Sequence, residues 1–183
     1  MTGKFLEVRK LSLTARLGRF LFRYRQVAGL LGFVLVALTG RPGPETLLNG
    51  LVLVLPGLLL RFWTAGYIGR ESRNPEISAT RLVVSGPYRY FRHPLYLGNF
   101  ALVAGVVVGF HPPVWSALVV LFGYLLIYGL ISRAEAEILA LACPQTESPG
   151  FSLREALAEW QTWLVTAVAF GFAGMKWLIF LRR

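Results

Sequence analysis

Long apolar blocks separated by short polar segments are the feature that most restricts how this chain can fold. The sequence is 55% hydrophobic and 15% charged, which is less charge than a soluble domain of 183 residues carries. A helix of about 20 apolar residues crosses a bilayer core that is about 30 Å thick. Strand-type alternation is absent, and irregular backbone cannot face lipid. The sequence therefore predicts an all-α fold, a polytopic transmembrane helical bundle of about five spans.

Turn residues set the boundaries of these spans. Short turns at 41–44 and 111–113 join neighbouring spans, and residues 143–152 are predicted to form a loop. We expect one membrane domain over residues 1–183, ending in a C-terminal span within 158–181. The predicted spans cover residues 27–39, 47–69, 94–110, 114–132 with a polar helical continuation to 141, and 160–181.

Residues 1–25 mix basic side chains with apolar ones at helical spacing. This pattern predicts an amphipathic basic helix on a membrane face that carries anionic lipid headgroups, with Arg25 snorkelling at the start of the first span. The alternative is a charged segment that only sets the topology, and the sequence leaves both open. The apolar members are Leu13, Leu17, Phe20, Leu21 and Tyr24, and the basic members are Lys10, Arg16, Arg19, Arg23 and Arg25.

The net charge of +10 predicts an orientation in the membrane. Basic residues cluster beside the apolar blocks, so topology and lipid headgroups explain the charge better than a nucleic-acid partner does. The excess of Arg and Lys predicts that the N-terminus and the connection 70–93 face the cytosol, together with residues 133–159. Five spans then place Lys176 and the C-terminal arginines on the other side, against the positive-inside rule.

The residue types present exclude several kinds of chemistry. Cys143 is the only cysteine, so no intrachain disulfide or thiolate cluster can form. His93 and His111 lie at opposite ends of one predicted helix, which makes a protein-built metal site unexpected. The chain contains no Asp, so a Ser-His-Asp triad would need Glu as a substitute.

The segment 86–99 reads GPYRYFRHPLYLGN and opens the third predicted span. Pro94 suits the first turn of a helix, which puts Arg92 and His93 at its positively polarised N-terminus. Tyr96 and Asn99 are three residues apart and share a face. Gly98 would let a second backbone or a ligand approach closely.

The tight turn at 111–113 makes the third and fourth spans antiparallel neighbours. The start of the third span should therefore lie beside the end of the fourth, where Tyr124, Tyr128, Ser132 and Glu135 share one side at helical spacing. We expect Arg92 and His93 to face Glu135 across a cleft lined with tyrosines, with Arg61 of the second span within reach.

A purely structural interpretation of the same residues remains open. Arg92 and His93 would then only set the topology, and Glu135 would pair with Arg133 or Arg92 to satisfy the helix ends. The tyrosines would pack the helices, and Arg61 would snorkel to the headgroups.

These residues also carry a family resemblance. The run 82–88, the triplet Arg92-His93-Pro94, and Tyr96 with Gly98 resemble the isoprenylcysteine carboxyl methyltransferase and phospholipid methyltransferase superfamily of membrane enzymes. The resemblance covers about residues 60–139, which we take as the cofactor-binding core. It includes Arg61-Phe62-Trp63, and at 131–139 it includes an acidic signature in which Glu135 is the first member and Ala136 replaces the second.

The resemblance implies S-adenosylmethionine as methyl donor and a lipophilic acceptor that enters from the bilayer, either an isoprenylcysteine-like carboxylate or a phospholipid amine. It implies catalytic roles for Arg92, His93 and Glu135 at the cytosolic membrane face. The segment Gly86 to Tyr88 would close over the cofactor. The predicted cofactor-binding residues are Gly86, Pro87, Tyr88, Arg92, His93, Tyr96, Gly98, Asn99, Tyr128, Ser132 and Glu135.

The sequence departs from the family pattern after residue 139. Relatives continue with a Phe-Gly pair and spaced tyrosines that help to close the pocket, whereas this chain has Ala142-Cys143-Pro144-Gln145. Two alternatives follow from the architecture and from this departure. One is a nicotinamide-dependent enzyme like the related sterol reductases, and the other is a non-catalytic membrane protein that kept the fold.

Overall fold

The computed structural model describes residues 11–73, 81–142 and 145–182, and almost all of their regular structure is helical. The long helices are α2 (Leu13–Thr39), α3 (Pro44–Ile68), α4 (Pro94–Phe110), α5 (Val114–Ala142) and α7 (Trp160–Leu181). Shorter elements are the 3-10 helices η1 (Gly69–Arg73) and η2 (Gly86–Arg89), the strands β1 (Arg81–Val83) and β2 (Gln145–Glu147), and helix α6 (Leu153–Leu157).

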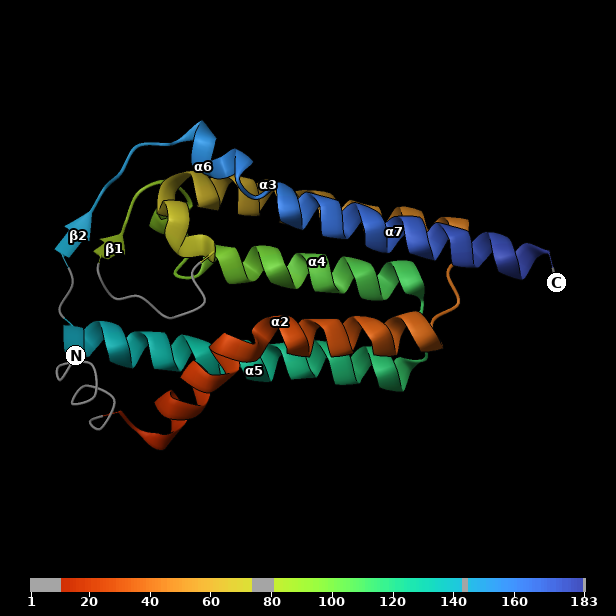
Figure 1. The fold of residues 1–183 in the computed structure, drawn as a ribbon, viewed down its shortest axis with the longest axis horizontal. Coiled ribbons are helices and arrows are strands. Elements are labelled where there is room, and N and C mark those ends of the chain that lie inside the picture. Colours follow the sequence, from red (N-terminus) through yellow and green to blue (C-terminus); the bar gives the residue numbers. More distant parts are fainter. Residues whose placement is uncertain (1–10, 74–80, 143–144, 183) are drawn as a thin grey trace.

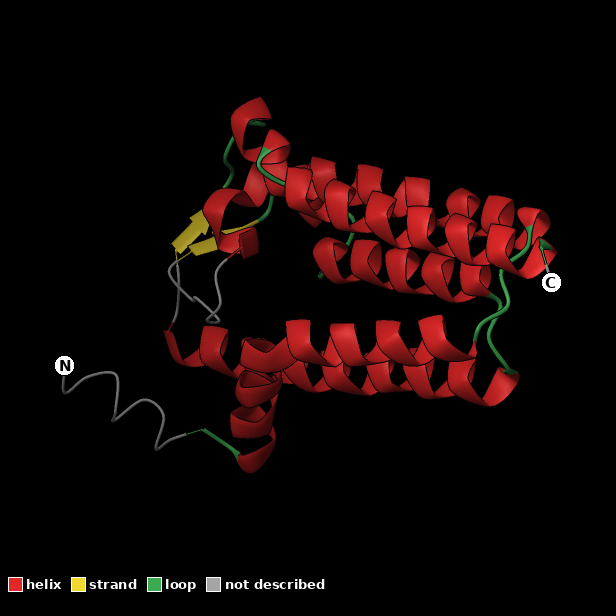
Figure 2. Ribbon diagram, turned by 45° about the vertical axis from the view of Figure 1, so that its right-hand side comes forward, coloured by secondary structure: helices red, strands yellow, loops and turns green. Residues whose placement is uncertain are grey.

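The long helices form two layers that run roughly parallel to one another, except for the first part of α2, which bends away from this direction (Figure 1 and Figure 2). Helix α2 packs along α5, and α3 packs along α4 with α7 beside both (Figure 1). Figure 2 shows the two layers from a second direction, with the short elements gathered at one end of the bundle. At that end α4 begins and α5 ends, and we call it the motif end.

Glycines let α3 and α4 approach backbone to backbone. A Cβ atom on Gly50 would lie 2.6 Å from the carbonyl oxygen of Gly105, and a Cβ on Gly105 would lie 2.7 Å from that of Gly50. Nearer the motif end, a Cβ on Gly98 would lie 3.2 Å from the carbonyl oxygen of Gly57 and 2.8 Å from Cγ of Arg61. The close approach predicted at Gly98 is therefore an approach to α3.

The predicted spans correspond to the observed helices. The third and fifth predicted spans coincide with α4 and α7, and the fourth continues to Ala142 as expected. Four of the described helices are long and apolar enough to cross a membrane, while α4 has 17 residues. At a rise of about 1.5 Å per residue, the 17 residues of α4 are roughly 25 Å long and the 29 residues of α5 roughly 43 Å. Because the two helices are joined by the turn at 111–113, α5 extends about 18 Å beyond the start of α4.

The N-terminal segment and the first span form one helix, which the sequence did not predict. The described part of this segment continues without a break from Leu13 to Thr39, and residues 1–10 of the predicted amphipathic helix lie outside the described ranges. Leu13, Leu17 and Phe20 of the predicted apolar face are exposed, as a lipid-facing surface requires. The helix contacts α5 through its other face, where Ala15, Gly18 and Phe22 are buried.

Lys176 of α7 binds the C-terminal end of α2. Its ammonium group donates to the carbonyl oxygens of Ala37 at 2.5 Å and Gly40 at 2.7 Å. A cation is stabilised there because the last carbonyls of a helix have no intrahelical donors and carry the negative end of its dipole. This contact gives Lys176 a packing role that a positive-inside count ignores.

A small two-stranded sheet covers the motif end, although no strand was predicted. Strand β1 pairs in parallel with β2, with Leu82 opposite Thr146. The chain after β2 is bound to the segment before η2, because the hydroxyl of Ser85 donates to the carbonyl oxygen of Pro149 at 2.7 Å. The backbone N–H of Ser152 donates to the carbonyl oxygen of Gly66 at 2.8 Å. The chain around Ser152 thus packs over the end of α3.

Candidate functional site

The turn before α4 places His93 at the start of that helix. Gly86 has φ +60°, a conformation that strains residues with a Cβ, and a Cβ there would also lie 2.5 Å from the ring of Tyr67. Pro94 occupies the first helical turn, where its missing N–H costs no hydrogen bond. His93 is therefore the N-cap residue of α4, as the sequence predicted.

His93 bridges two residues of α5. Its Nε2 lies 2.8 Å from the hydroxyl of Ser132, and its Nδ1 lies 3.4 Å from a carboxylate oxygen of Glu135. The other carboxylate oxygen of Glu135 accepts a hydrogen bond from the hydroxyl of Tyr96. The predicted meeting of the α4 start with the α5 end is therefore present, and we call these four residues the His93 cluster.

The protonation of His93 follows from its surroundings. Burial, together with the neighbouring Arg92 guanidinium, holds the pKa of His93 below its ordinary value, even though Glu135 lies close by. The imidazole is therefore neutral at pH 7. The partners then assign the proton to Nδ1, which faces an accepting carboxylate, and leave Nε2 to accept from Ser132.

Tyrosines form the wall below the His93 cluster. The rings of Tyr124 and Tyr128 stack with their centroids 4.2 Å apart, and the Tyr96 ring meets Tyr128 edge-on at 4.9 Å. The hydroxyl of Tyr124 donates to the backbone carbonyl of Tyr96 at 2.6 Å, which fixes the first turn of α4 against α5. Aromatic faces beside a carboxylate suit a cationic group.

Arg92 occupies a different place from the one the sequence suggested. Its side chain is exposed, and no hydrogen bond or ion pair to Glu135 is present within the described ranges. Arg92 acts on the site through the positive field that it adds at His93. Of the two basic residues expected to face Glu135, His93 contacts it directly, and the pairing of Arg92 with Glu135 in the purely structural interpretation is not observed among the described residues.

A second group of polar side chains joins α3, α4 and the start of α7. The guanidinium of Arg61 pairs with Glu159, the N-cap residue of α7, and also donates to the side-chain oxygen of Asn99. The side chains of Arg61 and Glu159 are 11% and 2% exposed, so this is a buried ion pair rather than a snorkelling arginine. Asn99 in turn donates to the hydroxyl of Tyr128 at 3.3 Å.

Sequence reasoning found Arg61 but missed Glu159 as its partner. The available signal was a single carboxylate directly before an apolar span, next to Trp160. The Arg61–Glu159 pair and Asn99 connect α7, α3 and α4 to the tyrosine wall of α5. Asn99 and Gly98, both predicted to bind a cofactor, thus have internal partners, and their contact with a cofactor stays a prediction.

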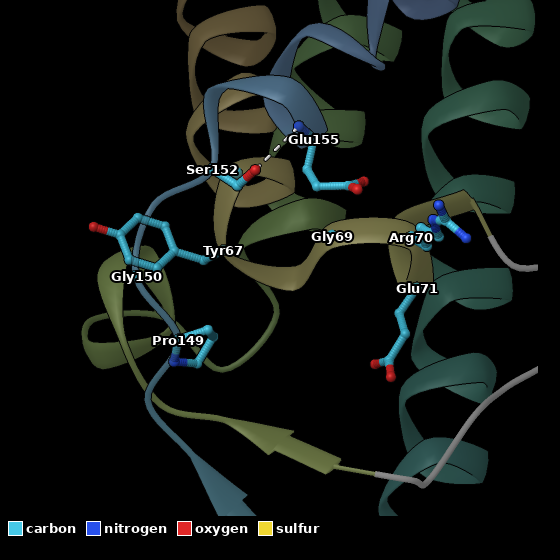
Figure 3. A pocket seen from close by; sticks show the side chains of 9 residues that line it. Tyr67, Gly69, Arg70, Glu71, Pro149, Gly150, Ser152 and Glu155 are labelled. Atoms are coloured by element: carbon cyan, nitrogen blue, oxygen red, sulfur yellow. Dashed lines mark hydrogen bonds between the residues drawn. The ribbon is translucent and has the colours of Figure 1, made fainter.

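A pocket of about 370 Å³ opens near the end of α3. It is lined by the end of α3, by η1 and by the chain around Pro149, and Figure 3 shows Glu71, Arg70 and Glu155 around it. Burial raises the pKa of Tyr88 in η2, and the carboxylates of Glu135 and Glu71 raise it further.

The apolar helices, with an Arg-His-Pro motif at the start of one of them, define a polytopic membrane protein with a polar site at one end. The family model of the phospholipid methyltransferases matches residues 46–142, and the chain belongs to that family. It is thereby a member of the group of integral membrane methyltransferases to which the sequence motif pointed.

Two curated relatives resemble the chain. It is 31% identical over 133 residues to the cobalt-zinc-cadmium resistance protein CzcN of Cupriavidus metallidurans, covering 69% of this chain and 58% of the relative. It is 35% identical over 86 residues to the nickel-cobalt-cadmium resistance protein NccN of Alcaligenes xylosoxydans xylosoxydans, covering 46% of this chain and 37% of the relative. The chain thus spans less than two thirds of either relative, and no solved structure matches it.

Proposed function

We propose that this protein is an S-adenosylmethionine-dependent methyltransferase that acts on a lipophilic acceptor at the cytosolic membrane face. The observation that carries the proposal is the His93 cluster, which forms on the family's motif and lies within the matched residues. His93 and Tyr96 come from the motif at the start of α4, and Ser132 and Glu135 come from the acidic signature in α5.

The cluster has the chemistry that S-adenosylmethionine requires. The cofactor carries a sulfonium and an ammonium, and the Glu135 carboxylate beside the rings of Tyr96 and Tyr128 offers complementary charge and aromatic faces. The cofactor's carboxylate suits Arg92, whose side chain is exposed beside the cluster.

When bound, the cofactor supplies an electrophilic methyl group, so the protein itself needs few titratable groups. Its residues would align the reactants and exclude water. A phospholipid amine arrives protonated and must lose a proton before it can react. The neutral imidazole of His93 is suited to accept that proton. A carboxylate acceptor would need no base, and the family membership favours the phospholipid amine.

Thermal stabilisation of the detergent-purified protein tests the cofactor. We expect S-adenosylmethionine and S-adenosylhomocysteine to raise the unfolding temperature and NADPH to leave it unchanged. Stabilisation by NADPH alone would support the reductase-like alternative. Stabilisation by none of the three would support a non-catalytic protein.

Substitution of Glu135 tests the site. Glu135→Gln keeps an acceptor for Tyr96 but removes the negative charge, so we expect affinity for S-adenosylmethionine to fall about 10- to 100-fold. Glu137→Gln is the matched control, because Glu137 lies on the same helix but accepts from Ser12, the N-cap residue of α2. Arg92→Ala should also weaken binding. Unchanged calorimetric affinity in both the Glu135 and Arg92 variants would refute the assignment.

The names of the relatives raise the question of metal binding. In the part of the chain that the structure describes, no group of three or more His, Cys, Asp or Glu side chains is placed to hold a metal ion. Adding Co²⁺ or Cd²⁺ to the thermal experiment tests for metal binding, because metal-dependent stabilisation would reveal a site that the described residues do not show.

A further inference from the structure

Arg25 lies on the face of α2 that packs against α5. Gly18 and Gly32 are each seven residues from it, which is almost two full helical turns, so all three share a face. A Cβ on Gly18 would lie 2.8 Å from Cβ of Ala134, and a Cβ on Gly32 would lie 3.6 Å from Val120. Between these two contacts, Arg25 stands level with the part of α5 that carries Tyr124 and Tyr128.

The side chain of Arg25 is held in place by its own helix. Its guanidinium carbon lies 3.9 Å from the centroid of the Phe22 ring, and one of its nitrogens donates to the carbonyl oxygen of Phe22 at 2.7 Å. Phe22 is buried against α5. The side chain of Arg25 is therefore directed along the side of α2 that faces α5. The sequence had suggested instead that it extends toward the headgroups.

The charge of Arg25 acts on the same residues that form the His93 cluster and its tyrosine wall. It interacts electrostatically with Glu135, Tyr96 and Tyr128. The nearby Arg23, two residues away along the helix, is exposed and shows no such interaction with these groups. An ionisable residue within a membrane-spanning helix is a functional candidate by default.

We propose that Arg25 binds the phosphate of a phospholipid acceptor and so orients the headgroup toward the His93 cluster. This inference rests on the proposed function and adds a binding residue from α2, which lies outside the matched residues 46–142. Its planar guanidinium presents five N–H donors in a geometry that suits phosphate oxygens, so it can serve more than one acceptor.

The arrangement of charges matches a headgroup with two ends. In a phosphoethanolamine headgroup, two carbons separate an anionic phosphate from an amine. Arg25 on α2 attracts the anionic end, and the stacked rings of Tyr124 and Tyr128 on α5 suit the cationic end. A lipid that enters between the two layers would thus be fixed with its amine at the His93 cluster and its acyl chains among the exposed apolar side chains of α2.

Lipid titration of the purified protein tests the role of Arg25 directly. The unfolding temperature is followed against short-chain phosphatidylethanolamine, diacylglycerol of the same chain length, and inorganic phosphate. The variants are Arg25→Gln, Arg25→Lys and the matched control Arg23→Gln, which removes the same charge from the other side of α2. We expect Arg25→Gln to need about 10- to 100-fold more phosphatidylethanolamine for the same stabilisation. Arg23→Gln should behave as the wild type.

Each outcome supports or overturns the proposal. Equal phosphatidylethanolamine dependence in Arg25→Gln and the wild type overturns it, and so does equal stabilisation by diacylglycerol. An Arg25-dependent response to inorganic phosphate alone would assign a free-anion site instead. If Arg25→Gln does not fold, Arg25→Lys decides, because it keeps the charge but loses the planar fork, and an unchanged lipid affinity would overturn the proposal.

Stabilisation by S-adenosylhomocysteine separates this inference from the proposed function. We expect Arg25→Gln to keep it, and its loss in that variant would assign Arg25 to the cofactor. If S-adenosylhomocysteine stabilises no variant, the proposed function fails, while the lipid comparison still decides whether Arg25 binds a phosphate.

Discussion

The hydroxyl of Ser132 lies 2.8 Å from Nε2 of His93, across the interface between α5 and α4. This contact joins α5 to the start of α4, the helix that precedes it in the chain. It also restrains the imidazole from the side opposite Glu135. The orientation of His93 therefore depends on a residue with no chemistry of its own in the proposed reaction.

Ser132→Ala should loosen His93 without changing the charge of the site. Loss of one hydrogen bond is worth about 1 kcal/mol, so we expect the affinity for S-adenosylmethionine to fall about fivefold. Thr166→Ala is the control, because its hydroxyl bonds only within α7. Calorimetric titration of both variants measures the difference. Equal affinities in the two would show that Ser132 does not position His93.

The stability of the protein should fall as the pH drops below the ordinary pKa of histidine, about 6.5. His93 has a lowered pKa in the folded protein, so the unfolded chain binds the proton more tightly, and folding is favoured at the higher pH. Unfolding temperatures between pH 5 and 8 measure this slope. His93→Gln should flatten the slope, and an unchanged slope would mean that other groups cause it.

The sequence predicted the helices and the His93 cluster because both depend on local signals. Apolar blocks of membrane-crossing length indicated α3, α5 and α7, and a shorter apolar block indicated α4. The short turn at 111–113 brought the part of α5 around Ser132 and Glu135 beside His93. Helical spacing alone then put Ser132 and Glu135 on one side of α5. Where one short connection determines the geometry, the sequence is sufficient.

The features that were missed depend on contacts distant in the chain. Glu159 lies 98 residues from Arg61, and their pairing follows from how α7 packs on α3. The pairing of β1 with β2 joins two three-residue segments that are too short for a periodic pattern. Arg25 was assigned to the headgroups because the first span was predicted to begin after it, whereas α2 had already begun at Leu13.

The buried pair of Arg61 and Glu159 should be essential for stability. Glu159→Gln leaves the Arg61 charge buried without its counter-ion, which costs about 3–5 kcal/mol. Glu45→Gln, in the exposed first turn of α3, is the control and should cost less than about 1 kcal/mol. Chemical unfolding in detergent measures both.

The double variant Arg61→Met with Glu159→Leu should recover much of the loss, because it removes both charges together. If Glu159→Gln and Glu45→Gln were equally stable, the pair would have no structural role.

The glycine contact between α3 and α4 should determine how closely these helices pack. In Gly105→Ala the new Cβ would lie 2.5 Å from Cγ2 of Val54 and 2.7 Å from the carbonyl oxygen of Gly50, so the helices must separate. Such overpacking costs about 1–3 kcal/mol.

Gly123→Ala on α5 is the matched control, because no heavy atom outside its own helix lies within 4 Å of its Cβ position. Alanine also favours a helix by up to about 1 kcal/mol, so this control should be neutral or stabilising. Since α4 carries His93, Gly105→Ala should also weaken binding of S-adenosylmethionine, and a variant that loses neither stability nor affinity would show that the contact is not limiting.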